Sequence, residues 1–255
     1  MRALVPILAA LAYLLSFLAL ALWPPVVLVV LLLTWPFDTN RAAAGRLLRA
    51  CGAFISRSFP LWQIRIEGRW PEAEGPFVVV SNHESYLDVL LISNLPHEMK
   101  WVSKRELFRI PWVGWAFALV GDLAIERGHP GSAANLMKRA RAYLDRGMSV
   151  IFFPEGTRSA DGRLLPFKPG AFKLAVEAGV PVLPLSVSGT ARGMPKGGLK
   201  IRPSRLTLRI LEPFPTRGLA EQQVPVLRDR VRERIARARS GTKEALEGVH
   251  AAESA

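Results

Sequence analysis

The chain has 255 residues, of which half are apolar, 34 are Lys or Arg and 21 are Asp or Glu, so its net charge is +13. This apolar content excludes a disordered chain, because enough surface can be buried to offset the loss of conformational entropy. The single cysteine, Cys51, excludes an internal disulfide framework and a cysteine-based zinc cluster. The length suits one compact domain of about 200 residues with an appendage.

The appendage is the N-terminus, where residues 3–37 carry no charge. One straight helix over this run would be about 50 Å long, whereas a bilayer core is about 30 Å thick. Pro24 and Pro25 predict a break or a kink in that helix. We therefore expect two arms, Ala3–Trp23 and Pro25–Phe37, that form a hydrophobic hairpin in the membrane.

The charges that follow this run indicate its orientation. Arg41, Arg46 and Arg49 come before any further acidic residue, so the positive-inside rule places the rest of the chain in the cytoplasm, at the inner membrane. A secretory signal peptide is the alternative, because residues 19–21 fit a small-x-small cleavage site. The segment after the run has the pattern of an amphipathic helix at the membrane interface, or of an ordinary surface helix.

From residue 61 onward, predicted strands alternate with predicted helices, which indicates an α/β fold with a mixed, largely parallel sheet flanked by helices. The predicted strands are Leu61–Glu67, Phe77–Ser81, Lys100–Ser103, Leu123–Ile125, Met148–Phe153, Val180–Val187 and Leu206–Leu211. The predicted helices are Ser85–Leu95, Arg105–Leu119 with an interruption at Pro111, Ser132–Arg146, Ala171–Ala178 and Val224–Ala238. The expected parts of the chain are a membrane-embedded helical segment at 1–40, an interfacial helix at 41–60, the α/β domain at 61–240 and a disordered tail at 241–255.

Two of these strands are followed by residues that can do chemistry. His83 comes directly after the strand Phe77–Ser81, and Asp88 lies five residues later, within a predicted helix. Active sites of open α/β sheets gather where strands end and helices begin. A carboxylate one helical turn from an imidazole can accept its Nδ1–H and leave Nε2 as a general base. The spacing alone fits a structural histidine as well.

The second such segment, Phe153–Ser159, also follows a strand. Gly156 permits close approach of the backbone, and the guanidinium of Arg158 offers a fork for phosphate oxygens. An anion site is one interpretation, and a tight turn with a surface arginine is the other. Residues 104–115, with Glu126 and Arg127 further on, combine cations with tryptophans that suit a water–lipid boundary or the buried side of a surface helix.

Prolines distinguish the strand Val180–Val187. Pro181 and Pro184 would be awkward in a central ladder, so we expect this strand at an edge of the sheet or in the wall of a site.

Four blocks in this order resemble the glycerolipid acyltransferases, and the chain is similar to the 1-acyl-sn-glycerol-3-phosphate (lysophosphatidic acid) acyltransferase family. The blocks are Asn82-His83-x4-Asp88, Lys104…Pro111-x2-Gly114, Phe153-Pro154-Glu155-Gly156-Thr157-Arg158-Ser159 and Val180-Pro181-x2-Pro184. The likeness covers about residues 75–190. Glu126 departs from the family pattern, in which aspartate commonly precedes the arginine, but it keeps the charge.

The resemblance implies a membrane-bound enzyme that moves an acyl chain from acyl-CoA or acyl carrier protein to the sn-2 hydroxyl of 1-acylglycerol-3-phosphate, giving phosphatidic acid. It implies that His83 is the general base and that Asp88 orients it, with no cofactor and no metal. The substrate-binding residues that it implies are Lys104, Arg127, Glu155, Gly156, Thr157 and Arg158.

The basic charge leaves other functions open. Clusters of Lys and Arg beside a membrane anchor favour anionic membrane lipid as a partner, and both expected acyl donors are anionic too. The acceptor could instead be another lysophospholipid, a lyso-ornithine lipid or glycerol 3-phosphate. A membrane-tethered nucleic-acid binder would also be basic, but no binding motif for nucleic acid is present, so none is expected as a partner. A secreted serine hydrolase lacks support because no Gly-x-Ser-x-Gly occurs.

Overall fold

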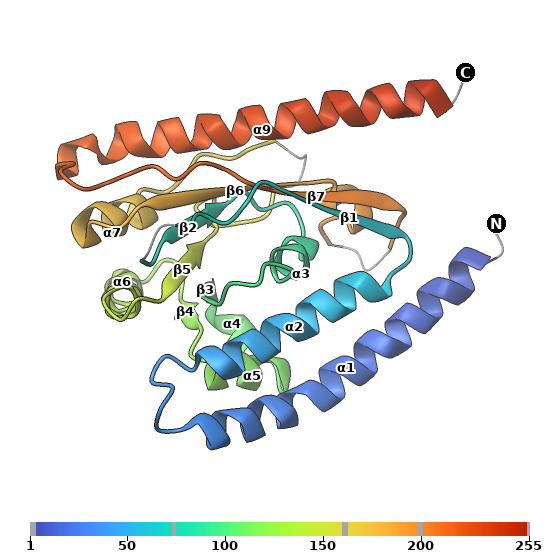
Figure 1. Ribbon diagram of the computed structural model, residues 1–255, viewed down its shortest axis with the longest axis horizontal. Helices are drawn as coiled ribbons and strands as arrows, with labels where there is room; N and C mark the ends of the chain where they lie inside the picture. Colours follow the sequence, from blue (N-terminus) through green and yellow to red (C-terminus); the bar gives the residue numbers. More distant parts are fainter. Residues whose placement is uncertain (1–3, 73–74, 160–162, 198–200, 254–255) are drawn as a thin grey trace.

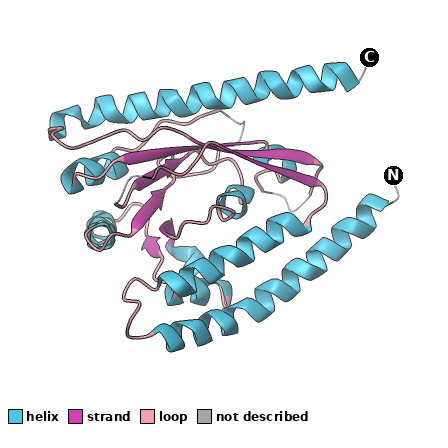
Figure 2. Cartoon of the chain, in the orientation of Figure 1, coloured by secondary structure: helices cyan, strands magenta, loops and turns pink. Residues whose placement is uncertain are grey.

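The computed structural model describes residues 4–72, 75–159, 163–197 and 201–253. Within these residues, seven strands form one sheet of order β1-β7-β6-β2-β5-β3-β4, with helices on both faces (Figures 1 and 2). All neighbouring strands pair in parallel except β6 and β7, which are antiparallel. The expected mixed, largely parallel α/β fold is therefore confirmed.

The elements lie close to the predicted positions, with a short helix, α8, and a 3-10 turn, η1, that the pattern did not predict. The strands are β1 (Trp62–Glu67), β2 (Val78–Ser81), β3 (Met99–Lys104), β4 (Leu123–Ile125), β5 (Ser149–Phe152), β6 (Val182–Ser188) and β7 (Ser204–Ile210). The helices are α1 (Leu4–Thr34), α2 (Ala42–Ser58), α3 (Leu87–Ile92), α4 (Arg105–Phe108), α5 (Val113–Leu119), α6 (Pro130–Leu144), α7 (Gly170–Ala178), α8 (Thr190–Gly193), η1 (Glu221–Gln223) and α9 (Val224–Glu253).

The two faces of the sheet have separate apolar cores, as the alternation along β2 shows. Val78 and Val80 pack in a cluster with residues of α6, α7 and α9, whereas Val79 packs with residues of α2 and α3 on the opposite face. Because both faces are covered, all four residues of β2 and of β5 are buried. This double burial fixes the carboxyl ends of the two strands, from which the residues predicted to be functional follow.

The N-terminal apolar run is one helix, so the prediction that it breaks at Pro24-Pro25 into two arms is wrong. Pro25 has no N–H to donate to the carbonyl of Ala21, which lies one turn earlier. The indole Nε1 of Trp112 donates to that carbonyl instead, at 2.9 Å. A donor from the domain thus satisfies the Ala21 carbonyl, which Pro25 leaves without its helical partner. The helix therefore continues past Pro25. The hairpin forms between α1 and α2, which lie side by side in Figure 1.

β6 is an interior strand between β7 and β2, so the expected edge position of its proline-containing segment is also wrong. The antiparallel pairing with β7 begins at Leu185 opposite Ile210, one residue after Pro184. The missing N–H of Pro184 therefore costs no bond of that ladder, while its carbonyl accepts the N–H of Leu211 at 3.0 Å. Pro181 lies just before the strand, and neither proline lines the cavity beside His83 that is described below.

A buried ionic cluster joins α2 to the sheet. Arg49 of α2 contacts Asp122 at 2.5 Å, and Lys100 of β3 donates to Glu98 at 3.2 Å and to the carbonyl of Val120 at 2.9 Å. Burial raises the pKa of the Glu98 carboxyl and lowers that of the Lys100 ammonium. Two cations and two carboxylates compensate one another here, so α2 is held to the domain by a balanced set of charges.

The C-terminal prediction needs a correction as well. Residues 241–253 continue α9 in place of the expected disordered tail, and residues 254–255 lie outside the described part of the chain. The long helix crosses one face of the sheet, opposite the face that carries α2 and α3 (Figure 1). The segment 42–58 is helical as expected; its place at a membrane interface stays a prediction.

Candidate active site

His83 and Asp88 form a hydrogen-bonded pair just beyond the end of β2. The Nδ1 of His83 lies 2.8 Å from Oδ2 of Asp88, whose side chain is fully buried in the first turn of α3. The same carboxylate oxygen accepts the backbone N–H groups of Glu84 at 2.6 Å and Ser85 at 2.9 Å. These bonds fix the turn between β2 and α3, so the imidazole has one orientation and presents Nε2 as its second nitrogen.

The loop after β5 holds His83 from the other side. Its ring stacks on Phe153, with centroids 4.2 Å apart, and its backbone N–H donates to Oε1 of Glu155 at 2.7 Å. The second oxygen of Glu155 accepts the N–H of Leu165 at 2.8 Å. The carbonyl of His83 accepts the N–H of Ser159 at 2.9 Å. The two segments that the sequence singles out are thus bonded into one unit at neighbouring strand ends.

A cavity of about 700 Å³ opens beside the imidazole. Five of the six predicted substrate-binding residues line it together with His83, and Glu155 is the exception. These five residues are Lys104, Arg127, Gly156, Thr157 and Arg158. Glu155 is buried below the loop, and burial raises the pKa of its carboxyl. Glu155 therefore positions the loop and His83, and the structure does not place it where it could touch a substrate in this cavity.

Three further residues of the cavity were not predicted from the sequence. Lys168 and Lys196 add two cations, and Lys196 donates to the backbone carbonyl of Arg158 at 2.8 Å. The guanidinium of Arg158 lies 3.8 Å from the ring centroid of Tyr86, which holds it by a cation–π contact. Tyr86 lies between His83 and Asp88 in sequence, so its place in the cavity could have been predicted from that position. The two lysines lie on later loops whose position only the fold reveals.

Gly156 has a conformational reason for its identity. Its φ is +70°, which favours glycine, and an added Cβ would lie 3.0 Å from Cε of Lys168. A side chain here would strain the loop and push on a cation of the cavity.

A second carboxylate lies beside the His83–Asp88 pair. Glu84 is buried and pairs with Arg239 of α9, and its backbone N–H is one of the donors to Asp88. Burial raises the pKa of the Glu84 carboxyl to about 7, against the opposing effect of Arg239. The C-terminal helix thereby contacts the turn that carries His83.

The one cysteine does not line the cavity. Cys51 is buried in α2, and burial raises the pKa of its thiol to about 11. Among the described residues, no group of three or more His, Cys, Asp or Glu side chains is arranged to hold a metal ion.

The fold and the sequence both have known relatives. Residues 63–188 match the family model described as Acyltransferase. The chain is similar to the crystal structure of the 1-acyl-sn-glycerophosphate (LPA) acyltransferase PlsC from Thermotoga maritima, with a TM-score of 0.79, 29% identity, and coverage of 95% of this chain and 98% of that one. The 1-acyl-sn-glycerol-3-phosphate acyltransferase of Limnanthes douglasii is 34% identical over 195 residues, which are 74% of this chain and 67% of that protein.

Two further relatives match about two thirds of the chain. The alpha enzyme of that name from Homo sapiens is 40% identical over 178 residues, covering 68% of this chain and 62% of that protein. The chloroplastic one from Arabidopsis thaliana is 42% identical over 163 residues, covering 63% of this chain and 46% of that protein. The chain thus spans between about half and two thirds of the length of these curated relatives.

The α/β sheet, the His–Asp pair at its strand ends and the matching family model define the acyltransferase class. Within that class, the chain belongs to the 1-acyl-sn-glycerol-3-phosphate acyltransferase family.

Proposed function

We propose that the protein transfers an acyl group from a thioester donor, acyl-CoA or acyl carrier protein, to the sn-2 hydroxyl of 1-acylglycerol-3-phosphate. The single observation that carries this proposal is that His83 and Arg158 line the same cavity. A lysolipid whose phosphate is bound by the guanidinium fork would have its free hydroxyl within the same enclosed space as the imidazole. Family membership supports the same reaction.

The reaction follows from the two side chains of the pair. Nε2 of His83 takes the proton of the acceptor hydroxyl, and the oxygen attacks the carbonyl carbon of the thioester. The tetrahedral intermediate collapses with cleavage of the C–S bond, and the imidazolium returns its proton to the departing thiolate. Asp88 accepts Nδ1–H throughout and stabilises the imidazolium. The products are phosphatidic acid and the free thiol of the donor, with no residue of the chain acylated and no cofactor in the cycle.

The cations of the cavity suit two anionic substrates. Arg158, Lys168 and Lys196 line it near the loop after β5, while Lys104 and Arg127 line it from the β3 and β4 side. Guanidinium and ammonium groups bind phosphate through charge-assisted hydrogen bonds. We assign the first group to the acceptor phosphate. Among acceptors this favours lysolipids with a phosphate and glycerol 3-phosphate over lyso-ornithine lipids.

Membrane attachment through α1 is part of the proposal. By length and composition, residues 7–34 could cross a membrane. One side of this helix is covered by the domain, as Trp23 donates to the carbonyl of Leu47 in α2 at 2.7 Å and Trp112 donates to Ala21. A helix held sideways in this way suits embedding in one leaflet, with its exposed side among acyl chains. The expected place on the cytoplasmic face of the inner membrane remains part of the same proposal.

An acyl-transfer assay on the full-length protein in vesicles tests this function. The protein is mixed with labelled acyl-CoA or acyl carrier protein and a panel of acceptors: lysophosphatidic acid, glycerol 3-phosphate, lysophosphatidylcholine and a lyso-ornithine lipid. We expect labelled phosphatidic acid from lysophosphatidic acid, and about 10²- to 10⁴-fold slower formation of it with the His83→Ala variant. Transfer to the lyso-ornithine lipid alone would replace the proposed acceptor, and salt-sensitive RNA or DNA binding without transfer would contradict the enzyme.

A further inference from the structure

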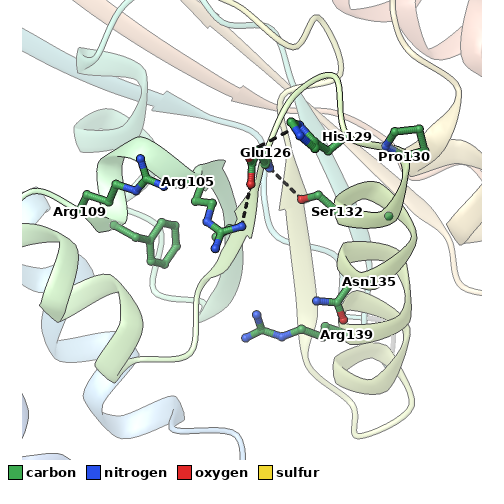
Figure 3. A pocket seen from close by; sticks show the side chains of 11 residues that line it. Arg105, Arg109, Glu126, His129, Pro130, Ser132, Asn135 and Arg139 are labelled. Atoms are coloured by element: carbon green, nitrogen blue, oxygen red, sulfur yellow. Dashed lines mark hydrogen bonds and ion pairs between the residues drawn. The ribbon is translucent and has the colours of Figure 1, made fainter.

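A second cavity, of about 760 Å³, lies between α4 and α6 and adjoins the catalytic cavity (Figure 3). The two share Glu126, His129 and Pro130 as lining residues, so they meet along the turn between β4 and α6. Lys104 lines the catalytic cavity, and the next residue, Arg105, lines the second cavity. None of the steps proposed above uses it. We call it the arginine cavity.

Its charge is strongly positive. Three guanidinium groups line it, from Arg105 and Arg109 at α4 and from Arg139 on α6, against the single carboxylate of Glu126. In Figure 3 the side chains of Asn135 and Arg139 extend from α6 toward the element that carries Arg105. With His129 neutral, three positive charges and one negative charge leave a net charge of +2 among the lining residues. Such a cavity attracts anionic ligands.

The carboxylate of Glu126 does not prevent Arg105 from binding a ligand. Arg105 donates to Oε2 of Glu126 at 2.7 Å, and Nδ1 of His129 lies 3.7 Å from Oε1. The Arg105 side chain is 55% exposed and that of Glu126 34% exposed, so solvent screens this pair. Exposed pairs of this kind contribute little to stability. A phosphate with two charges can therefore draw the Arg105 fork away from Glu126 at little cost.

The remaining lining suits a nucleotide more than a bare ion. The first turn of α6 begins at Pro130 without a side-chain cap, so the positive end of the helix dipole adds to the positive potential. Phe108 and Pro130 supply apolar surface next to the cations. The volume falls within the range of about 300–1,000 Å³ that is typical of small-molecule and cofactor sites. An organic ligand with several phosphates fits this combination.

We propose that the arginine cavity binds the phosphate groups of the coenzyme A part of the acyl donor. This inference rests on the proposed function. Acyl-CoA has its thioester at one end of a long flexible arm and its phosphates at the other, so the phosphates need a cationic site that is separate from the base but connected to it. The shared turn at residues 126–130 gives that connection, over which the arm passes toward His83. The cations near Arg158 then stay available to the acceptor.

The first test measures steady-state kinetics of Arg105→Gln, Arg139→Gln and the double variant, in full-length protein in vesicles. Lys138→Gln is the matched control, because Lys138 is an exposed cation on α6 that does not line the cavity. Losing a charge-assisted hydrogen bond weakens binding about 10- to 100-fold. For the double variant we expect an increase of at least about tenfold in the KM for acyl-CoA, an unchanged KM for lysophosphatidic acid, and kcat at saturating donor within about threefold of the wild type. Lys138→Gln should behave as the wild type.

The second test does not need turnover. Adenosine 3′,5′-bisphosphate, which carries phosphates of coenzyme A without the thioester arm, is titrated calorimetrically into the wild type and the double variant. Binding that the double variant loses supports the proposal even if no acceptor is ever acylated, so failure of the proposed function is seen separately. Bisphosphate binding that is independent of the arginines, or no binding at all, overturns the proposal.

Two other outcomes would also overturn it. The first is that only acyl carrier protein serves as donor, that the double variant raises the KM for it, and that the bisphosphate does not compete with it. The cavity would then bind a protein partner. If the double variant instead loses affinity for phosphatidylglycerol vesicles with an unchanged KM for acyl-CoA, the cavity binds a lipid headgroup. Far-UV circular dichroism and thermal unfolding of each variant show whether it is folded.

Discussion

The strands β2 and β5, whose ends carry the site, and the N-terminal helix α1 are built from similar apolar residues. They differ in how far these residues are buried. Every residue of β2 and β5 is buried, whereas Phe17 and Leu33 of α1 are 67% and 75% exposed. Burial on both faces of the sheet fixes His83 and Glu155 in one geometry. The exposed side of α1 has the surface of a helix that needs an apolar surrounding. The proposed catalytic and membrane-attachment roles therefore fall on separate regions, and we expect that substitutions can disturb one without the other.

Asp88→Asn should show the largest effect, on the side of catalysis alone. An asparagine amide can still accept backbone N–H groups through its oxygen, but it does not stabilise the imidazolium. We expect kcat to fall about 10²- to 10⁴-fold. Membrane binding, measured by vesicle flotation, should be unchanged. A variant with near-normal kcat would show that the pair is structural, and loss of flotation would show that the two regions are not separable.

Arg49→Met should weaken the attachment of α2, against which α1 packs, to the sheet. It leaves Asp122 and Glu98 buried with Lys100 as their one remaining cation in the cluster. Breaking a buried ion pair by removing one partner costs about 3–5 kcal/mol, which we expect in the free energy of unfolding, measured by chemical denaturation in detergent. Arg46→Met is the control, because Arg46 is exposed on the same helix, and it should change stability by less than about 0.5 kcal/mol. Equal effects of the two substitutions would contradict this account of the cluster.

Glu84→Gln should change how stability depends on pH. The pKa of Glu84 is about 7 in the folded protein and 4.5 for the free side chain, so between these values the native state binds a proton that the unfolded state lacks. This contribution is favourable below pH 4.5 and is lost as pH rises toward 7, by up to about 3 kcal/mol.

The measurement is the unfolding free energy of both proteins from pH 4.5 to 8. The wild type should lose stability relative to Glu84→Gln as pH rises to about 7 and then stay level. A wild type that gains stability over this interval would show that the pair with Arg239 outweighs the burial of Glu84.

Arg158→Ala should have the smallest effect of the four and should discriminate between acceptors. Losing the fork removes about 1.5–3 kcal/mol of binding to a phosphate, so the KM for lysophosphatidic acid should rise about 10- to 100-fold with kcat nearly retained. With 1-acylglycerol, which has no phosphate, wild type and variant should give the same kcat/KM. If the preference for the phosphate-bearing acceptor does not change, the arginine acts only on the loop.

The sequence predicted the parts of the molecule that depend on local pattern. The strand positions and the pairing of His83 with Asp88 follow from apolar runs and from one helical turn of spacing. The continuity of α1 could not be predicted, because the donor that satisfies Ala21 is Trp112, far away in the chain. In the same way Lys168 and Lys196 enter the cavity only because the loops that carry them converge on the carboxyl ends of β2 and β5.

The assignment of His83 as the base is tested most directly by single-turnover acyl transfer with His83→Ala in full-length, vesicle-bound protein, under saturating donor and acceptor. We predict a fall in rate of about 10²- to 10⁴-fold. Vesicle flotation and binding of adenosine 3′,5′-bisphosphate should match the wild type, and far-UV circular dichroism should show that the variant is folded. A rate within about threefold of the wild type would contradict the central claim that this imidazole removes the proton of the acceptor hydroxyl.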